Sequence, residues 1–165
     1  MSPYCFSKSH GHAGGAHNIR AERIHFEGTD NGIRVKANRD RGNNVGPLFF
    51  RDIDMKNGKN ALVISEYYPK ILPPDSELPQ PVTRLTPHFH DITIENVTAT
   101  GSTSAGTIAG LPEAPISGVV LHHVQISART GLTIGYAEVS GDGVVIESSE
   151  GRSISKLAGA RVLLH

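Results

Sequence analysis

Arg34 and Lys36 are the two residues whose types and spacing most directly suggest chemistry. They stand in the stretch GTDNGIRVKANRDRG, residues 28–42, where four of the chain's sixteen basic residues fall within eight positions. Side chains two apart in a β-strand point the same way. An Arg beside a Lys suits an acidic ligand, because the guanidinium offers a planar fork for a carboxylate or phosphate and the ammonium a compact charge. The pattern indicates an anion-binding site, with a solvated strand face as the alternative.

The residues around this pair predict a turn followed by a strand. The segment GTDNG, residues 28–32, is rich in the residue types that tolerate a positive φ and form tight turns. The next four residues alternate between apolar and basic types. We therefore expect Ile33 and Val35 to face a core, and Arg34 and Lys36 to face outward together.

The composition fits one domain spanning residues 1–165. Sixteen Lys and Arg balance sixteen Asp and Glu, so no net charge is expected to attract nucleic acid or a membrane surface. No apolar run approaches the roughly 20 residues of a membrane span. Residues 1–12, MSPYCFSKSHGH, lack the apolar core of a signal peptide.

Short apolar segments recur along the chain and predict a solenoid. Four rounds of a longer unit followed by a short strand can be aligned, at residues 18–36, 48–65, 91–110 and 118–135. Without the Pro-rich segment, residues 69–88, the period is roughly 20–30 residues, as in repeat proteins. The apolar spacing is not helical. We expect an all-β solenoid of parallel strands with residues 69–88 inserted between coils. An antiparallel sandwich is the alternative.

Several segments, taken in order, resemble the family 28 glycoside hydrolases, which are the polygalacturonases and related pectin-degrading enzymes. The resemblance rests on the Gly pair at 14–15, NIRAERIHFEG, the GTDNG turn before Arg-Val-Lys, FRDIDMKN, FHDITIENVTATGS and GLPEAPISGVVLHHVQIS. It runs from about residue 14 to about residue 143. It implies a right-handed, single-stranded parallel β-helix of the pectin-lyase-like type. The chain is expected to be its C-terminal portion, truncated at the N-terminus.

The resemblance also implies a substrate and three residues that bind it. In the family, the Arg and Lys of Arg-x-Lys bind a galacturonate carboxylate beside the scissile bond, and they correspond to Arg34 and Lys36. A family Tyr shortly before a Pro contacts the sugar, and Tyr68 in VISEYYPK is the matching position. A packing role is the alternative for Tyr68. The implied substrate is α-1,4-linked galacturonan, that is polygalacturonate or pectin, hydrolysed without a cofactor by a parent enzyme that is extracellular or periplasmic.

The catalytic acids of the family have no counterpart in this chain. Inverting hydrolysis needs two carboxyl groups about 6.5–9.5 Å apart, which the family supplies in Asn-Thr-Asp and Asp-Asp segments before a Gly-His-Gly segment. The sequence contains neither acidic segment. His10, in Ser-His-Gly-His, is the candidate for the motif histidine, with a loop histidine as the alternative. The isolated chain is expected to be weakly active or inactive.

Two other functions and a metal site are alternative interpretations of the sequence. The chain could be a non-catalytic β-helix that binds acidic polysaccharide, or a pectate-lyase-type enzyme. The lyase would use Ca²⁺ with acidic ligands, for which no cluster of carboxylates is present. Nine histidines include the pairs His10/His12 and His88/His90, but they lack the four-ligand spacing of zinc sites. We therefore expect no metal and no cofactor.

Overall fold

The structure, a computed structural model, describes residues 15–69 and 78–165, and within them every regular element is a β-strand. In chain order these are β1 (Ile19–Glu27), β2 (Asn31–Lys36), β3 (Asn44–Val45), β4 (Leu48–Lys56), β5 (Asn60–Ser65), β6 (His88–Ala109), β7 (Ile116–Gly135), β8 (Ala137–Asp142), β9 (Val145–Lys156) and β10 (Arg161–Leu164). Every pairing between these strands is parallel. The described ranges contain no helix long and apolar enough to cross a membrane.

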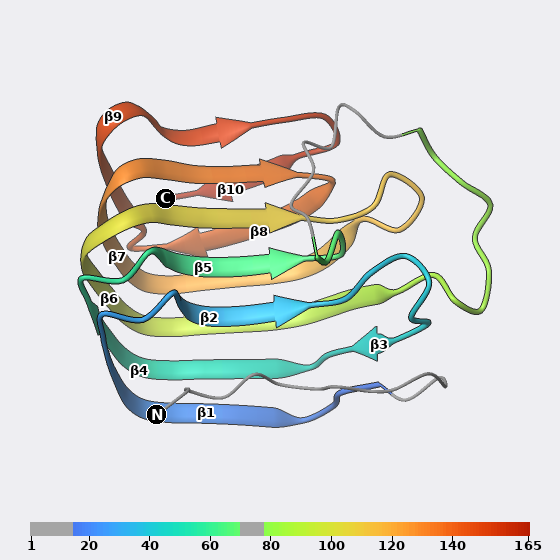
Figure 1. Cartoon of the computed structure of the whole chain (residues 1–165), viewed down its shortest axis with the longest axis horizontal. Helices are drawn as coiled ribbons and strands as arrows, with labels where there is room; N and C mark the ends of the chain where they lie inside the picture. Colours follow the sequence, from blue (N-terminus) through green and yellow to red (C-terminus); the bar gives the residue numbers. More distant parts are fainter. Residues whose placement is uncertain (1–14, 70–77) are drawn as a thin grey trace.

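The strands wind into a parallel β-helix in which each coil lies against the one before it (Figure 1). β1 and β2 form one coil, and β4 and β5 form the next. The long strand β6 continues the stack through both sides, because its residues 92–100 pair with β4 and its residues 104–109 pair with β5. This arrangement confirms the expected all-β parallel β-helix and excludes the antiparallel sandwich.

The four repeats expected from the sequence stack in register. Ile19 pairs with Leu48, Leu48 with Ile92, and Ile92 with Val119. A fifth coil, made by β8 and β9, follows them, and Val119 pairs with Val139 at its start. This coil is absent from the predicted repeats because its first strand, AEVSGD, holds too few apolar residues to show the pattern.

The coils bend at residues in the left-handed conformation. Arg23, Asp52, Asn96 and His123 have φ values of 54°, 54°, 51° and 50°, and the residues on either side of them are paired from coil to coil. Asn and Asp adopt this conformation more readily than other residues with a side chain. The Asn96 amide donates a hydrogen bond to Asp52 Oδ1 at 3.1 Å. This column of bends lets a single long strand turn a corner without losing register.

Asn18, Asn60 and Asn96 occupy different columns of the stack. Asn18 precedes β1 with a φ of 53°. Asn60 opens β5, and its amide donates to Asn31 Oδ1 at 3.3 Å. Asn96 stacks on Asp52 instead.

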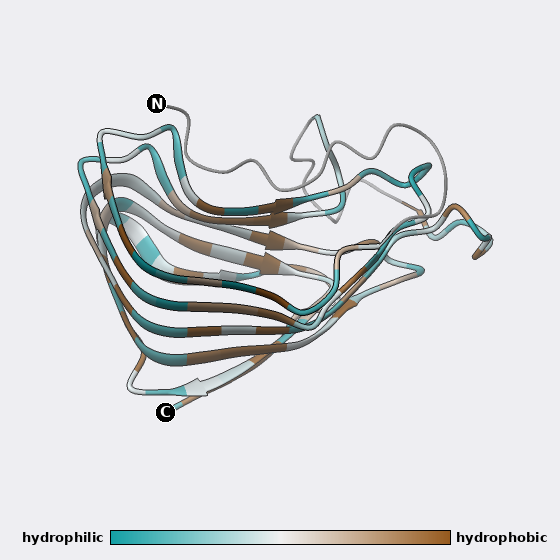
Figure 2. Ribbon diagram, turned by 90° about the horizontal axis from the view of Figure 1, so that it is seen from below, coloured by the Kyte–Doolittle hydropathy of each residue, from teal (hydrophilic) through white to brown (hydrophobic). Residues whose placement is uncertain are grey.

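Columns of inward-facing apolar side chains fill the interior. One column holds Ile24, Ile53, Val97 and Val124. Along the strands, hydrophobic segments recur at each level of the stack, and hydrophilic residues gather at the bends (Figure 2). The core thus forms a rigid support for the side chains that point outward.

Within the described residues, β1 is the first strand of the stack and lies beside an apolar cavity. Among the described strands, β1 pairs only with β4. A cavity of about 320 Å³ lies at this end, and its apolar lining includes Ala21, Ile24, Phe26 and Phe50. At the side of the stack, residues 66–87 connect β5 to β6. Their described parts, 66–69 and 78–87, contain no strand, and residues 70–77 of the expected Pro-rich loop lie outside the described ranges.

Candidate functional site

Strand β2 places the Arg–Lys pair on the outer surface of the stack. Ile33 and Val35 are 3% and 7% exposed and belong to the core, whereas Arg34 and Lys36 are half-buried on the opposite face. Among the described strands, β2 pairs only with β5. Arg34 and Lys36 therefore point to the same side, on an edge strand.

Tyr68 brings the two cations together under one aromatic ring. The centre of its ring lies 3.9 Å from Lys36 Nζ and 5.7 Å from the Arg34 guanidinium carbon. Both distances allow an attractive interaction between the cation and the ring face. The Tyr68 backbone N–H donates to the Ala37 carbonyl at 2.9 Å, which ties this residue to the end of β2. Tyr68 remains 42% exposed, so a ligand can reach the group.

One donor of this group is unused. The Nε atom of Arg34 is buried and has no hydrogen-bond partner among the described residues. A buried polar group without a partner is costly, so such groups usually find one. An oxygen of a bound anion is a suitable partner for a guanidinium N–H.

The neighbouring tyrosine has the packing role that was the alternative for Tyr68. Tyr67 is 7% exposed and forms a small apolar cluster with Ala109, Leu111 and Ala114. Its backbone N–H donates to the hydroxyl of Ser65 at 3.2 Å. The turn after β5 thus holds one tyrosine inside the stack and offers the other to solvent.

Glu66, on the same turn, is a functional candidate that sequence reasoning missed. Its side chain has no exposed surface, and burial raises the pKa of its carboxyl to about 8, although the N–H groups of Leu111 and Phe89 oppose the rise. Oε2 accepts the Leu111 N–H at 3.0 Å. In the sequence, Glu66 could have been found as a single Glu between the apolar run ALVIS and a pair of tyrosines.

An ion pair joins the loops beside the site. The guanidinium of Arg39 donates to Glu113 through two contacts, Nε to Oε1 at 2.6 Å and a terminal nitrogen to Oε2 at 3.2 Å. Partial burial favours a higher pKa for Glu113, but the hydrogen bonds and charge of Arg39 outweigh it and leave the pKa below its ordinary value. The Gln80 N–H also donates to Glu113, at 3.4 Å. Three connecting segments therefore meet at one carboxylate.

The other candidate residues do not join this group. His10 and His12 lie outside the described residues. His90 bonds its neighbour Asp91 at 2.9 Å, and His88 is exposed. No cluster of three or more His, Cys, Asp or Glu residues that could hold a metal ion occurs in the described part of the chain.

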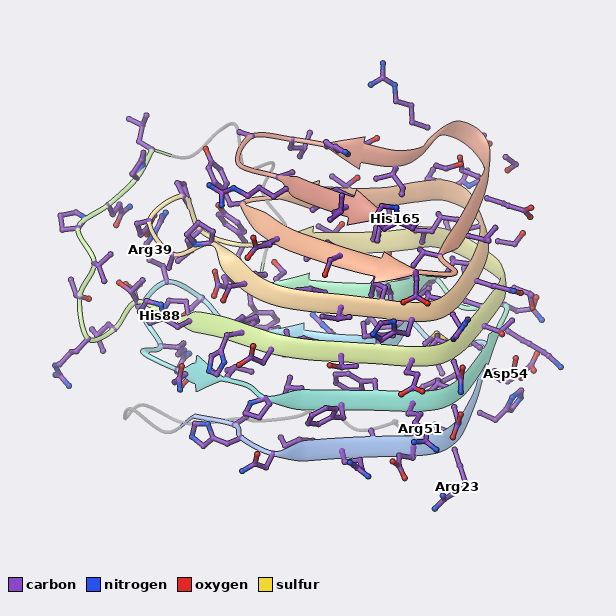
Figure 3. All side chains as sticks on the ribbon, turned by 180° about the vertical axis from the view of Figure 1, so that it is seen from behind. Arg23, Arg39, Arg51, Asp54, His88 and His165 are labelled. Atoms are coloured by element: carbon purple, nitrogen blue, oxygen red, sulfur yellow. The ribbon has the colours of Figure 1, made fainter. Side chains whose placement is uncertain are left out.

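The acidic residues near the bend of β4 pair with neighbouring side chains on the surface. Asp54 accepts from His25 Nδ1 at 2.8 Å, and Asp52 pairs with Arg51 at 3.2 Å. Figure 3 shows Arg51 and Asp54 on one side of the stack and Arg39 on the opposite side. Asp30, in the turn before β2, pairs with Lys59 at 2.6 Å; this hydrogen bond and the Lys59 charge lower the pKa of Asp30.

Comparison with known proteins gives one match. The family model described as glycosyl hydrolases family 28 matches residues 7–147, which include β2, Tyr68 and Glu66. Neither the curated proteins nor the solved structures include one that matches the chain.

Proposed function

Since the chain belongs to family 28 of the glycosyl hydrolases, we propose that β2 and Tyr68 bind a galacturonate unit of an α-1,4-linked galacturonan. Arg34 grips the carboxylate through its planar fork, Lys36 adds a second positive charge, and the Tyr68 ring contacts the sugar. The observation that carries this proposal is the juxtaposition of two cations beneath one half-exposed ring.

The proposed reaction of the full-length parent is hydrolysis with inversion, outside the cytoplasm. One carboxylic acid protonates the leaving oxygen while a carboxylate about 6.5–9.5 Å away activates water. The sequence lacks both Asp-Asp and Asn-Thr-Asp, so the proposal places these acids outside this chain. The residues of this chain then act by positioning, because they hold the substrate beside the scissile bond. His10 stays a prediction for the family's histidine.

A binding module without catalysis is the second candidate. The missing acidic segments favour it, because the proposed cation group alone can bind an acidic polymer without cleaving it. The two candidates share the binding site and differ in the release of new reducing ends. We expect the isolated chain, residues 1–165, to bind galacturonan and to release few or no reducing ends.

Calorimetric titration with short oligogalacturonates at low salt tests the binding proposal. Arg34→Ala should weaken binding about 10- to 100-fold, as expected from the loss of a charge-assisted contact. Arg51→Ala is the matched control, because it removes an exposed arginine of β4 that pairs with Asp52 and is not part of the proposed site. Fully methyl-esterified oligosaccharide should not bind, since it lacks the carboxylate.

Two outcomes would overturn parts of the proposal. Equal affinity of Arg34→Ala and wild type, or equal affinity for the ester, would exclude carboxylate recognition by Arg34. Release of reducing ends by the purified chain well above the buffer rate would show that its own residues supply the acid and the base.

A further inference from the structure

The turn after β5 is fixed on both sides by its backbone. The Glu66 N–H donates to the Ala109 carbonyl at 3.1 Å, and the Tyr68 N–H donates to the Ala37 carbonyl at 2.9 Å. Ala109 ends β6, and Ala37 directly follows β2. The turn therefore bridges the coil that carries the cations and the coil of β6.

The Glu66 side chain extends the attachment to residues 110–115, the loop that follows β6. Its Oε2 accepts the Leu111 N–H at 3.0 Å, while Oε1 is buried and has no hydrogen-bond partner among the described residues. An ionised carboxylate with one bare oxygen would be strongly disfavoured in such a place. An uncharged carboxyl is compatible with it, because it still accepts the Leu111 N–H and leaves no net charge unpaired.

The charged and titratable groups around Glu66 do not neutralise it. Glu113, on the same loop, raises the Glu66 pKa through its negative charge, and that charge is balanced by Arg39 at 2.6 Å. Tyr67 packs beside Leu111 in the apolar cluster. From β6, the Phe89 backbone N–H opposes the rise more than the Glu113 charge adds to it, but an N–H group carries no net charge that could neutralise a carboxylate. No ion pair to Glu66 is found among the described residues, so its ionisation would bury an uncompensated negative charge.

We infer that Glu66 is a positioning residue for the proposed sugar site: its side chain holds the turn against residues 110–115 and thereby keeps Tyr68 over Lys36 and Arg34. The inference rests on the proposed function only for its consequence in sugar binding. Ionisation of Glu66 would leave a buried charge without a cation, so the turn opens to hydrate the carboxylate and the ring leaves the cations. Sugar binding should therefore weaken as the pH rises through about 8.

The contact between Tyr68 and Lys36 can be measured without any ligand. A ring 3.9 Å from Nζ shifts the NMR signal of the Lys36 side-chain methylene next to that nitrogen. Tyr68→Ala removes the ring and defines the unshifted position. In wild type we expect the ring-induced shift at pH 6.5 and its loss by pH 9.5. Glu66→Gln, which resembles the uncharged carboxyl in shape, should keep the shift at both pH values.

The outcomes for wild type and the Glu66 variants each support or overturn the positioning role of Glu66. It is overturned if wild type and Glu66→Gln respond identically to pH, or if Glu66→Ala keeps the full shift at pH 6.5. If Glu66→Gln does not fold, the wild-type titration decides, because an unchanged shift at pH 9.5 excludes the role. Oligogalacturonate titration is a separate arm, in which Glu66→Gln should bind at pH 9.5 at least 5-fold more tightly than wild type. The expected NMR response without any sugar binding would uphold the positioning role and reject the proposed function.

Discussion

Single residues in this protein acquire their chemistry from neighbours that are distant in the sequence. Arg39 and Glu113 are 74 positions apart, and Glu66 and Leu111 are 45 apart. Neither pair could be predicted from local patterns. The outward direction of Arg34 could be predicted, because it depends only on strand alternation around it.

The buried carboxyl of Glu66 predicts a pH dependence of folding stability. Burial raises its pKa from 4.5 to about 8 in the folded chain. The folded state then binds the proton more tightly, so the stabilisation is complete below about 4.5 and is lost as the pH rises toward 8. Within that window the free energy of unfolding should fall by about 1.4 kcal/mol per pH unit from this group.

Denaturant unfolding of wild type and Glu66→Gln between pH 5 and 8 measures this contribution. The stability of wild type relative to that of Glu66→Gln should fall steadily across the window, because Gln does not titrate. Glu138→Gln, which removes an exposed carboxylate of β8, is the control and should run parallel to wild type. A constant difference between wild type and Glu66→Gln would exclude a raised pKa for Glu66.

At the scale of the strands, close contact between neighbouring coils limits the residue type at some positions more strictly than the hydrophobic pattern does. Gly106 lies within the inward column of Ile33, Leu62 and Leu132, where the other members are large. A Cβ atom at Gly106 would lie 1.7 Å from the Leu62 carbonyl oxygen, and φ at this residue is +121°. The obstacle is backbone of the adjacent strand, which cannot move without breaking the register.

Gly106→Ala should therefore lower the free energy of unfolding by more than about 3 kcal/mol. Gly151→Ala is the matched control, because φ there is +74° but no atom lies within 4 Å of the added Cβ. Gly151→Ala should lower the free energy of unfolding only by the strain of a left-handed alanine, about 1–2 kcal/mol. Denaturant titration of both variants compares them directly. Similar losses would show that backbone conformation, and not contact with Leu62, constrains Gly106.

The strands and their order were predictable, since apolar alternation and turn residues repeat with the coils. The fifth coil was not predictable in the same way. β8 has buried Ala137 and Val139, but the rest of the strand is polar or glycine. Its place in the stack depends on pairing with β7, which supplies Ile116 and Val119 as partners. A coil can thus be specified by the coil beneath it as well as by its own pattern.

At the scale of the whole molecule, the stack has an end that is suited to pairing. Within the described residues, β1 pairs with β4 alone, and an apolar cavity of about 320 Å³ lies beside it. At the other end Leu163 of β10 is 63% exposed. An unpaired strand edge beside apolar surface is a template for another strand. The same edge carries Arg34 and Lys36 on β2, so association at this end would cover the proposed sugar site.

We therefore expect the purified chain to self-associate in a concentration-dependent manner, as measured by light scattering after size exclusion. Ala21→Lys places an ammonium group in the apolar lining of the cavity and should shift the protein toward monomer. Leu163→Lys distinguishes two modes of association. If the β1 end of one molecule meets the β10 end of another, Leu163→Lys should shift the protein toward monomer as much as Ala21→Lys does. If two β1 ends meet, it should have no effect. Ser149→Lys, on the exposed surface of β9, is the control. A wild-type monomer across the whole concentration range would exclude both modes, and association that is unaffected by Ala21→Lys would place the contact elsewhere on the coils.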